Sequence, residues 1–336
     1  MKICVFGAGA IGGVVVARLA AAAGRSKSGN EISVLARGAQ LAAIRERGLR
    51  LVDSEGTDIT VKLEASDDPG ALGPQGLVVV ALKGHQLPAA APAIAALLGP
   101  KTRVVMILNG IPWWYFYGVA GAHRDRRLPT LDPEGALWRL IGPERVIGCV
   151  AYCSARVEAP GLVRQNGGRS FALGEPGGAM SDDLKRATRL FDAAGLNATA
   201  STHIRDEIWG KLLFNSAINP TGALVGCPSG ELARDPGAAG VLRRIMTETL
   251  AVGKAHGARM DDDIDGLIEG AKQFGANKSS MLQDMERGRP LELDGILGAV
   301  LTLGEIAGVA APTIETVLAL VRLRGRVAER EAARRA

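Results

Sequence analysis

The sequence predicts an α/β protein in which an N-terminal Rossmann-like doubly wound sheet domain is followed by an all-α C-terminal domain. A glycine-rich turn lies near the N-terminus, strand and helix patterns alternate to about residue 110, and long helical segments follow residue 202. Alternating strands and helices are typical of a parallel sheet covered by helices. Because 336 residues suffice for two domains, we place the first at 1–201 and the second at 202–336.

The first domain can be predicted element by element from its N-terminus. KICVF forms a strand, the glycines after it a tight turn, and AIGGVVVARLAAAAG a helix. EISVLAR forms the second strand, AQLAAIRERG a helix ended by Gly48, and LRLVDSEGTDITVKLEA a hairpin. GLVVVALK and TRVVMILN are apolar runs typical of strands buried on both faces of a parallel sheet, and LPAAAPAIAALLG forms a helix between them.

An irregular insert at about 111–145 follows these strands. Its aromatics cluster from Trp113 to Tyr117, which is compatible with a lid or with an insertion packed by its own aromatics. Strands and turns resume in ERVIGCVAYCSARVEAPGLVRQNGGRSFALGE, and SDDLKRATRLFDAAG forms a helix capped by Ser181 and ended near Gly195. From about residue 202 the pattern is helical only, which defines the second domain.

Composition argues against several classes of protein. Apolar residues make up 47% and charged residues 22%, as in soluble globular proteins. Much of the net charge of +5 lies in the tail RLRGRVAEREAARRA, which we expect to be a solvated helix end. No basic face interleaved with stacking aromatics and no bilayer-spanning apolar run is found, so neither a nucleic-acid nor a membrane partner is expected. The N-terminus resembles a signal peptide in places, but its spaced glycines and Arg18 argue against one.

Cysteine and histidine spacing predicts neither disulfides nor a metal site. The four cysteines contain no CxxC pair, which favours a reducing cytoplasm. Cys149 and Cys153 lie four apart in one predicted strand, so we expect buried thiols on the same side rather than metal ligands. The histidines show no metal spacing and no triad arrangement, and we assign structural or surface roles to all of them: His85, His123, His203 and His256.

The N-terminal turn carries the strongest motif. Gly7, Gly9 and Gly12, with Ala10 and Ile11 between them, form GxGxxG directly after a strand and at the start of a helix. The first glycine permits the turn, the second lets a pyrophosphate approach the backbone, and the third lets helix and strand pack closely. The N-terminus of the helix supplies N–H groups for phosphates. The motif therefore predicts dinucleotide binding.

The end of the second strand indicates which dinucleotide is bound. It carries Arg37 and lacks the acid that would bind the ribose hydroxyls of NAD, whereas a guanidinium matches a 2′-phosphate. NADP(H) is therefore expected. The alternative is that Arg37 is a surface charge without a role in cofactor binding. Lys83 and Asn109 lie at the carboxyl ends of two later strands, where an open α/β sheet binds its ligand, and together they outline one edge of the cofactor site.

The helical domain contains a polar stripe in an apolar segment, DEIWGKLLFNSAINP. Lys211, Asn215 and Asn219 recur at intervals of four, so on a helix each step turns only about 40° and the three side chains share one face. Such a stripe is a binding site or a solvated face. Further along, NKSSMLQDMERGRPLELD offers candidate polar groups, and its glutamate, flanked by leucines, should be partly buried and in need of a partner. These candidates are Asn277, Ser280 and Glu292.

With these residues assembled, the chain resembles the ketopantoate reductases (2-dehydropantoate 2-reductases). The resemblance covers nearly the whole chain apart from about 111–145, and it rests on GAGAIG, VALK, LNG, EIWGKLLFNSAINP and SSMLQDMERGRPLELD. It implies NADPH-dependent reduction of ketopantoate to pantoate, a step of pantothenate and coenzyme A biosynthesis. The small-molecule partner would then be a 2-oxo acid, while the oligomeric state, a homodimer included, stays open.

The resemblance also implies roles residue by residue. Lys211 matches the catalytic lysine, Glu292 the substrate-binding glutamate and Arg37 the 2′-phosphate arginine. Ser229 departs from the pattern, because a site of the family often has asparagine there. The remaining matches are residues that hold substrate or order the site, Asn215, Asn219 and Ser280, and residues that contact the cofactor, Lys83 and Asn109.

These roles describe a hydride transfer from the cofactor to a ketone, with Lys211 protonating the oxygen as general acid. Asn215 and Ser280 are neutral donors for a carboxylate, and Glu292 can accept from a substrate hydroxyl. Burial would lower the pKa of Lys211 and Glu292 would raise it, so the sign of its shift stays open. The stripe is expected to form one wall of a cleft between the domains.

Two other functions fit parts of the same pattern. A reductase of another 2-oxo acid, or an opine-type dehydrogenase, would keep the glycine turn and use the helical domain differently. A non-enzymatic NADP(H) sensor would bind the cofactor and leave Lys211 dispensable. The potential acid, carboxylate donors and hydroxyl acceptor together favour the ketopantoate reductase interpretation.

Overall fold

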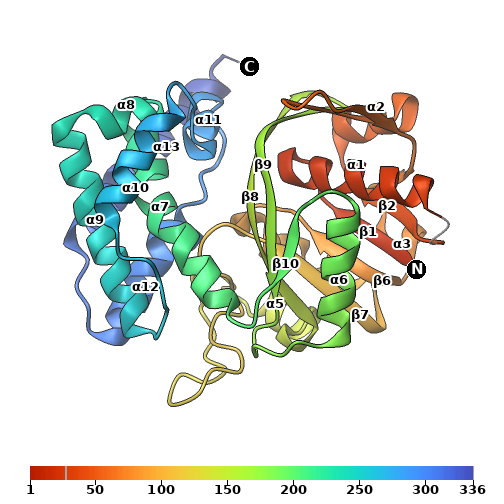
Figure 1. Cartoon of the computed structure of the whole chain (residues 1–336), viewed down its shortest axis with the longest axis horizontal. Coiled ribbons are helices and arrows are strands. Elements are labelled where there is room, and N and C mark those ends of the chain that lie inside the picture. Colours follow the sequence, from red (N-terminus) through yellow and green to blue (C-terminus); the bar gives the residue numbers. More distant parts are fainter. Residues whose placement is uncertain (27–28, 336) are drawn as a thin grey trace. The chain divides into compact units, whose positions relative to one another are not determined.

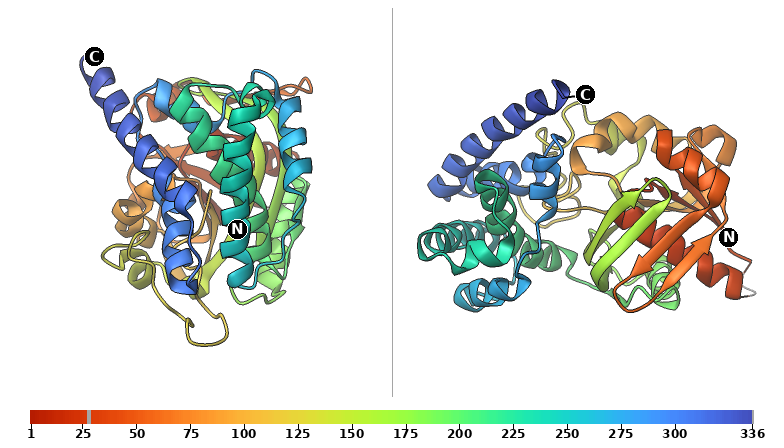
Figure 2. Two further views of the ribbon diagram at one scale, coloured as in Figure 1. Left: turned by 90° about the vertical axis from the view of Figure 1, so that its left-hand side faces the viewer. Right: turned by 90° about the horizontal axis from the view of Figure 1, so that it is seen from above.

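The computed structural model describes residues 1–26 and 29–335, so residues 27 and 28 of the polar segment 25–30 lie outside it. The chain forms two compact units (Figures 1 and 2). The first contains Met1–Leu108 and Trp113–Ile204, and the second contains Asn109–Pro112 and Arg205–Ala336. The four-residue segment Asn109–Pro112 therefore belongs to the helical unit although the chain on both sides of it belongs to the other.

The first unit is built on one sheet of ten strands. Their order is β4-β3-β9-β8-β7-β6-β1-β2-β5, and β10 pairs with β9. The strands are β1 (Lys2–Phe6), β2 (Glu31–Leu35), β3 (Leu49–Asp53), β4 (Asp58–Val61), β5 (Glu64–Ser66), β6 (Gln75–Val80), β7 (Leu98–Ile107), β8 (Val146–Ala159), β9 (Leu162–Gly174) and β10 (Ala198–Ala200).

Helices of the first unit connect these strands. They are α1 (Ala10–Arg25), α2 (Gly38–Arg47), α3 (Pro69–Leu72), α4 (Leu87–Ala95), α5 (Ala136–Leu140) and α6 (Asp182–Ala193), with the 3-10 turns η1 (Gly84–Gln86) and η2 (Pro143–Arg145). The predicted cap of α6 is present, because Ser181 accepts a hydrogen bond from the N–H of Leu184 at 3.1 Å.

The strands β5, β2, β1, β6, β7 and β8 pair in parallel, in the order expected for a Rossmann-like sheet. Successive side chains of a strand point to opposite faces. In β1, Ile3 and Val5 pack in one core with residues of α1 and α6, while Cys4 and Phe6 on the opposite face are also buried. The sheet is therefore buried on both faces, and the predicted fold class is confirmed.

The far end of the sheet mixes antiparallel and parallel pairs. The long strands β8 and β9 are antiparallel, as are β3 and β4 of the predicted hairpin, whereas β3 pairs with β9 in parallel. This end packs on α1 through a buried ion pair: Arg18 donates to Asp53 at 2.8 Å and to Gln165 at 3.0 Å. Asp53 also accepts from the backbone N–H groups of Glu55 and Thr57. Arg18, the buried charge of α1, thus fastens the helix to the end of the sheet.

The aromatics of the insert are part of the core. Residues Trp113 to Phe116 are each at most 3% exposed. The ring of Trp114 lies so close to the backbone of β8 that a Cβ on Gly148 would come within 2.6 Å of it. Of the two alternatives for this cluster, the structure favours an insertion packed by its own aromatics.

The second unit contains helices and no strand among its described residues 109–112 and 205–335. Its elements are α7 (Ile204–Val225), α8 (Ser229–Arg234), α9 (Pro236–Ala255), α10 (Ile264–Ala271), the 3-10 turn η3 (Lys272–Phe274), α11 (Ser280–Glu286), the π-helical segment η4 (Asp294–Gly298), α12 (Ala299–Ala307) and α13 (Pro312–Ala333). The prediction of an all-α second part is confirmed.

Helix α9 anchors its neighbours in this unit. Trp209 of α7 is fully buried against Gly253 of α9, and the hydroxyls of Ser216 and Thr249 form a buried hydrogen bond of 2.9 Å between the same helices. The carboxylate of Glu248, also on α9, accepts from the first backbone N–H groups of α13 at 3.0 and 2.9 Å. Such N–H groups have no partner within their own helix, so this contact fixes the start of α13.

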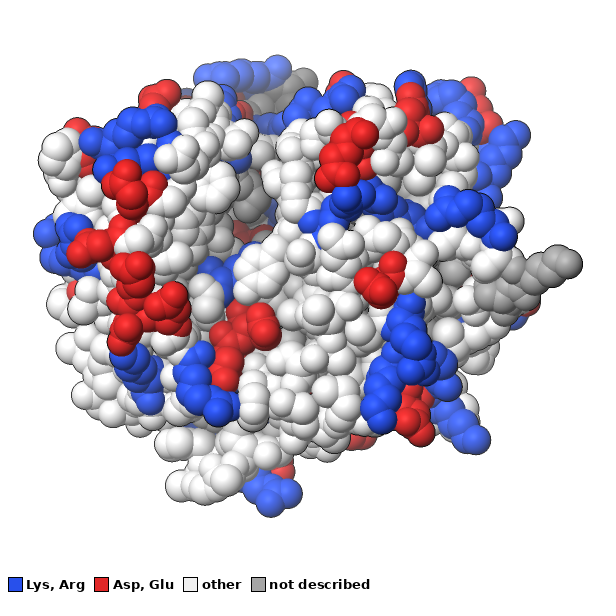
Figure 3. Space-filling view, viewed as in Figure 1, with Lys and Arg blue, Asp and Glu red and all other residues white. Residues whose placement is uncertain are grey.

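Charges of both signs are interspersed on the molecular face seen in Figure 3. In the helical unit, Arg243 pairs with Asp265, and Lys254 pairs with Asp262 at 2.9 Å. Exposed pairs of this kind contribute only about 0.2–1 kcal/mol each. The first pair joins α9 to α10, and the second joins α9 to the loop before α10.

Candidate active site

The glycine turn has the geometry that a pyrophosphate requires. Gly7 has a φ of +105°, and a Cβ there would lie 2.9 Å from the backbone oxygen of Ala81. A Cβ on Gly12 would lie 1.9 Å from the oxygen of Gly7, so only glycine lets α1 approach β1 so closely. A Cβ on Gly9 would meet nothing within 4 Å, which leaves open space above the turn. The three glycines therefore fit a bound dinucleotide phosphate.

Helix α1 presents its N-terminus to that space. It begins at Ala10, followed by Ile11, and its N-cap Gly9 has no side chain to occupy the first N–H groups. Gln40 of α2 donates to the backbone oxygen of Ala8 at 2.8 Å, which ties α2 to the turn. Sequence reasoning missed Gln40, since nothing in its local pattern distinguishes it from a surface glutamine.

Arg37 and Lys83 follow the two strands that flank β1. In the parallel register, Phe6 is opposite Leu35 of β2 and Val80 of β6, so the segments after all three strands lie at one sheet edge. Arg37 is exposed. Strand β6 ends at Val80, three residues before Lys83, because the chain turns there into η1, where the Lys83 N–H donates to Gln86 at 3.0 Å.

The polar stripe lies on α7 as the spacing predicts. Lys211 and Asn215 are half-buried, and Asn219 is 7% exposed. The opposite side of the helix is formed by fully buried side chains, among them Trp209 and Leu212. Desolvated polar groups in such a helix need hydrogen-bond partners, and the partners of the stripe show what it can bind.

Asn109 connects the stripe to Glu292. Its Oδ1 accepts a hydrogen bond from Nζ of Lys211 at 2.9 Å, and its Nδ2 lies 3.5 Å from Oε2 of Glu292. One amide thus faces an ammonium with its oxygen and a carboxylate with its nitrogen, which is the orientation that both charges favour. All three residues belong to the second unit. The sequence predicted Asn109 as a cofactor contact, and the structure adds this bridge between Lys211 and Glu292.

A close backbone contact positions Asn109. The N–H of Ile111 donates to the oxygen of Gly295 in η4 at 2.8 Å. Gly110 has a φ of +76°, and a Cβ there would lie 2.1 Å from that same oxygen. Glu292 lies two residues before η4, so one backbone contact joins the segment that carries Asn109 to the segment that carries Glu292. π-helical turns frequently occur at functional sites.

Asn277 lies three residues before α11, and Ser280 is the first residue of that helix. Both are exposed, and Ser279 rather than Ser280 caps α11. The backbone oxygen of Asn277 accepts from the N–H of Ser229 at 3.1 Å. The buried Ser229 therefore contacts the segment through its backbone.

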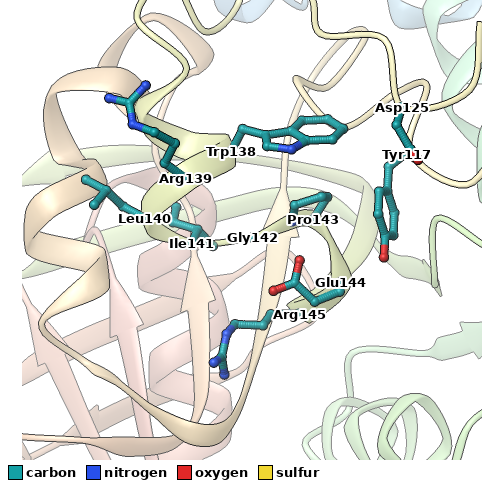
Figure 4. A pocket seen from close by; sticks show the side chains of 10 residues that line it. All are labelled: Tyr117, Asp125, Trp138, Arg139, Leu140, Ile141, Gly142, Pro143, Glu144 and Arg145. Carbon is teal, nitrogen blue, oxygen red and sulfur yellow. The ribbon is translucent and has the colours of Figure 1, made fainter.

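A cavity of about 420 Å³ lies in the first unit, within the insert (Figure 4). Burial, together with the nearby carboxylates of Glu144 and Asp125, raises the pKa of the Tyr117 hydroxyl at its rim. The residues that line the cavity are Tyr117, Asp125, Trp138, Arg139, Leu140, Ile141, Gly142, Pro143, Glu144 and Arg145. They include none of the residues predicted for cofactor or substrate, so the cavity is separate from the predicted chemistry.

Other kinds of site are not indicated by the described residues. Within 1–26 and 29–335, no three His, Cys, Asp or Glu side chains gather as metal ligands, and all four cysteines are free thiols. Burial raises the pKa of Cys4 to about 11, so this thiol is unreactive at neutral pH. None of the described helices combines the length and apolar character needed to cross a bilayer.

Both units match known protein families. Residues 3–178 match the family described as "Ketopantoate reductase PanE/ApbA", and residues 203–325 match "Ketopantoate reductase PanE/ApbA C terminal". The 2-dehydropantoate 2-reductase of Mesorhizobium japonicum is 46% identical over 96% of this chain and 97% of its own.

Solved structures of similar proteins cover nearly the whole chain. A Ralstonia solanacearum MolK2 protein, inferred to be a ketopantoate reductase, is 39% identical with a TM-score of 0.90 over 97% of this chain and 98% of its own. D-mandelate dehydrogenase with NADH and anilino(oxo)acetate, at 24% identity over 98% of this chain and 99% of its own, shares the fold with a TM-score of 0.82. Matches of this extent show that the chain belongs to the ketopantoate reductase family.

Proposed function

We propose that the protein reduces 2-dehydropantoate (ketopantoate) to pantoate with NADPH, using Lys211 as the general acid. The observation that carries this proposal is the hydrogen-bonded group of Lys211, Asn109 and Glu292. Family membership and the 46% identical reductase of M. japonicum support the reaction. In this proposal residues 1–201 bind the cofactor, and residues 202–336 supply the acid and most of the substrate contacts.

The proposed acid is positioned by its amide partner. NADPH, when bound, supplies the hydride that reduces the ketone carbon. The ketone oxygen gains negative charge as the hydride arrives, and the ammonium of Lys211 stabilises that charge and then donates the proton. Asn109 takes one of the three N–H donors of Lys211, which limits rotation of the ammonium and aims it at the substrate.

Other polar groups of the helical unit match the rest of the substrate. Ketopantoate carries a carboxylate beside its ketone and a hydroxyl at its other end. Asn215 and Asn219 extend from Lys211 along α7, and their amides suit the carboxylate. The carboxylate of Glu292 suits the hydroxyl as an acceptor, and we assign Asn277 and Ser280 to the substrate site as further neutral donors.

The cofactor preference is proposed from Arg37. The open glycine turn fits the pyrophosphate of either nicotinamide dinucleotide, since it binds a group that both have. Only NADPH has a 2′-phosphate, and the guanidinium of Arg37 at the end of β2 offers it two N–H donors. Lys83 at the same sheet edge is proposed as a second cofactor contact.

A steady-state assay tests this function. NADPH oxidation is followed with ketopantoate, with NADH as the alternative cofactor, and with a panel of other 2-oxo acids. Turnover that requires ketopantoate and prefers NADPH supports the proposal. The fold also occurs in D-mandelate dehydrogenase. Preferred turnover of another 2-oxo acid would therefore keep the fold and the role of Lys211 and change only the assigned substrate. Tight NADPH binding without any turnover would favour a sensor.

A further inference from the structure

An exposed phenylalanine lies beside the helix that carries the proposed acid. Phe274 ends η3 and is 45% exposed, which is unusual for so large an apolar side chain on this protein. Its ring meets the ring of Phe214 edge-on, with centroids 5.7 Å apart and planes at 60°. Aromatic pairs of this geometry attract beyond their apolar burial. Phe214 therefore holds the exposed ring in place.

Phe214 borders the polar stripe of α7. It lies between Lys211 and Asn215 in the sequence, and at 100° per residue it points about 60° to one side of Lys211. Asn215 points about 40° to the other side. The stripe of polar groups thus has an aromatic border formed by Phe214, and Phe274, packed edge-on against Phe214, adds a second ring to it.

The backbone of Phe274 is fixed although its ring is exposed. Its carbonyl accepts from the N–H of Asn277 at 3.0 Å, and the next residue, Gly275, accepts from the N–H of Gly230 in α8 at 3.1 Å. A Cβ on Gly230 would come within 2.4 Å of the nitrogen of Gly275, so α8 and η3 are in direct backbone contact. A rigid backbone with an exposed ring is a preorganised apolar surface.

We propose that Phe274, supported by Phe214, determines which 2-oxo acids the enzyme accepts, by contacting the branched carbon next to the ketone. The inference rests on the function proposed above. Ketopantoate is 4-hydroxy-3,3-dimethyl-2-oxobutanoate, so its ketone is attached to a carbon with two methyl groups. Polar groups along α7 and Glu292 match its ketone, carboxylate and hydroxyl, whereas the methyl groups need an apolar surface. The aromatic border supplies one next to Lys211.

The test pairs a change in the protein with a change in the substrate. Phe274→Ala and the unchanged protein are each assayed with ketopantoate and with 4-hydroxy-2-oxobutanoate, which lacks only the two methyl groups. The expected result is a fall in kcat/KM of about 10- to 100-fold for ketopantoate, because a methylene in an apolar pocket contributes discrimination of this size. For the unbranched acid the fall should stay within about 3-fold.

A matched control separates this role from a structural one. Leu323 of α13 is 51% exposed in the same unit, and Leu323→Ala should leave kcat/KM unchanged for both acids. Phe274→Leu keeps apolar area and should retain much of the preference, and it stays testable if Phe274→Ala fails to fold. Equal losses for both substrates in both Phe274 variants, or no loss in either, would overturn the inference.

The activity of the wild-type protein toward ketopantoate is measured first. If it does not reduce ketopantoate, the proposed function fails and this inference fails with it. If it reduces ketopantoate and the Phe274 variants keep the full preference for the branched acid, only the specificity inference fails. The two failures are therefore distinct.

Discussion

Asn109 accepts a hydrogen bond from Lys211 at 2.9 Å although the two residues are 102 positions apart in the chain. Asn109 belongs to a four-residue segment of the helical unit that is flanked on both sides by the sheet unit. The proposed acid and the amide that orients it are therefore held in the same compact unit. On this hydrogen bond we base the proposal that Asn109 positions the acid, a role that differs from the cofactor contact predicted from its place after β7.

Replacing Asn109 distinguishes these two roles. In Asn109→Ala, Lys211 loses its acceptor and Glu292 its donor, so kcat for ketopantoate should fall by about 10²-fold, as a misplaced catalytic group does. KM for NADPH should change little. Steady-state kinetics with both substrates varied measures the two effects. A large rise in KM for NADPH at normal kcat would instead support the cofactor role.

The close contact of Gly110 with Gly295 should be sensitive to a single methyl group. Gly110→Ala combines a positive φ, which costs about 1–2 kcal/mol, with a steric clash that costs about 1–3 kcal/mol. Asn109 should move with the displaced backbone, so kcat should fall as well as the free energy of unfolding. Urea denaturation and kinetics at saturating substrate measure both.

Gly257 provides the control for that variant. It lies in the same unit with a φ of +79°, but a Cβ there would meet nothing within 4 Å. Gly257→Ala should cost about 1–2 kcal/mol of unfolding free energy and leave kcat unchanged. If both alanine variants lose kcat equally, the contact between Gly110 and Gly295 does not position the site.

Arg37 should set the choice between the two dinucleotides. In Arg37→Ala the 2′-phosphate loses a charged donor, which is worth about 10- to 100-fold in affinity, while NADH has no group to lose. Fluorescence titration with NADPH and NADH gives the ratio of dissociation constants. Arg47→Ala, at the far end of α2, is the matched control and should leave the ratio unchanged. An unchanged ratio in Arg37→Ala would mean that the 2′-phosphate is bound elsewhere.

Low pH should reduce the free energy of unfolding of the first unit, because it protonates Asp53. Burial alone would raise the pKa of this carboxyl, but hydrogen bonds from Thr57, Glu55 and Arg18 outweigh it, so the pKa is lowered. A lowered pKa in the folded state means that the stabilisation is present above the unfolded pKa of about 3.9 and is lost as pH falls below it. Urea denaturation between neutral pH and about pH 3 should show this loss in the unchanged protein.

Asp53→Asn removes the titrating group and leaves the cation of Arg18 buried without its counter-charge. The free energy of unfolding at neutral pH should fall by about 3–5 kcal/mol, the usual result of breaking a buried pair. Its dependence on pH over the acidic range should become shallower. A variant as stable as the unchanged protein at neutral pH would show that the ion pair is not needed to hold α1 on the sheet.

Local patterns account for the features that the sequence predicted well. The glycine turn follows from the φ of Gly7 and the contact of Gly12, both of which depend on neighbours within a few residues. The buried strands follow from unbroken apolar runs, and the stripe of Lys211, Asn215 and Asn219 follows from helical periodicity. Each of these signals is contained in a window of fewer than about 20 residues.

Long-range packing accounts for what the sequence did not predict. The hydrogen bond of Lys211 to Asn109 and the buried pair of Arg18 with Asp53 join residues that no local pattern relates. The sequence also predicted strand ends two or three residues beyond those in the structure. Apolar residues continue past the end of β6 into the turn before Lys83, so the sequence pattern does not mark where that strand ends. The exposure of Phe274 depends on how α8 holds η3, which no periodicity reveals.

The most direct test of the central claim is kcat for ketopantoate-dependent NADPH oxidation by Lys211→Ala, measured beside the unchanged protein. Removal of the general acid should lower kcat by about 10²-fold or more, while the dissociation constant of NADPH stays nearly the same. An alanine variant that turns over ketopantoate at the rate of the unchanged protein would contradict the assignment of Lys211 as the acid.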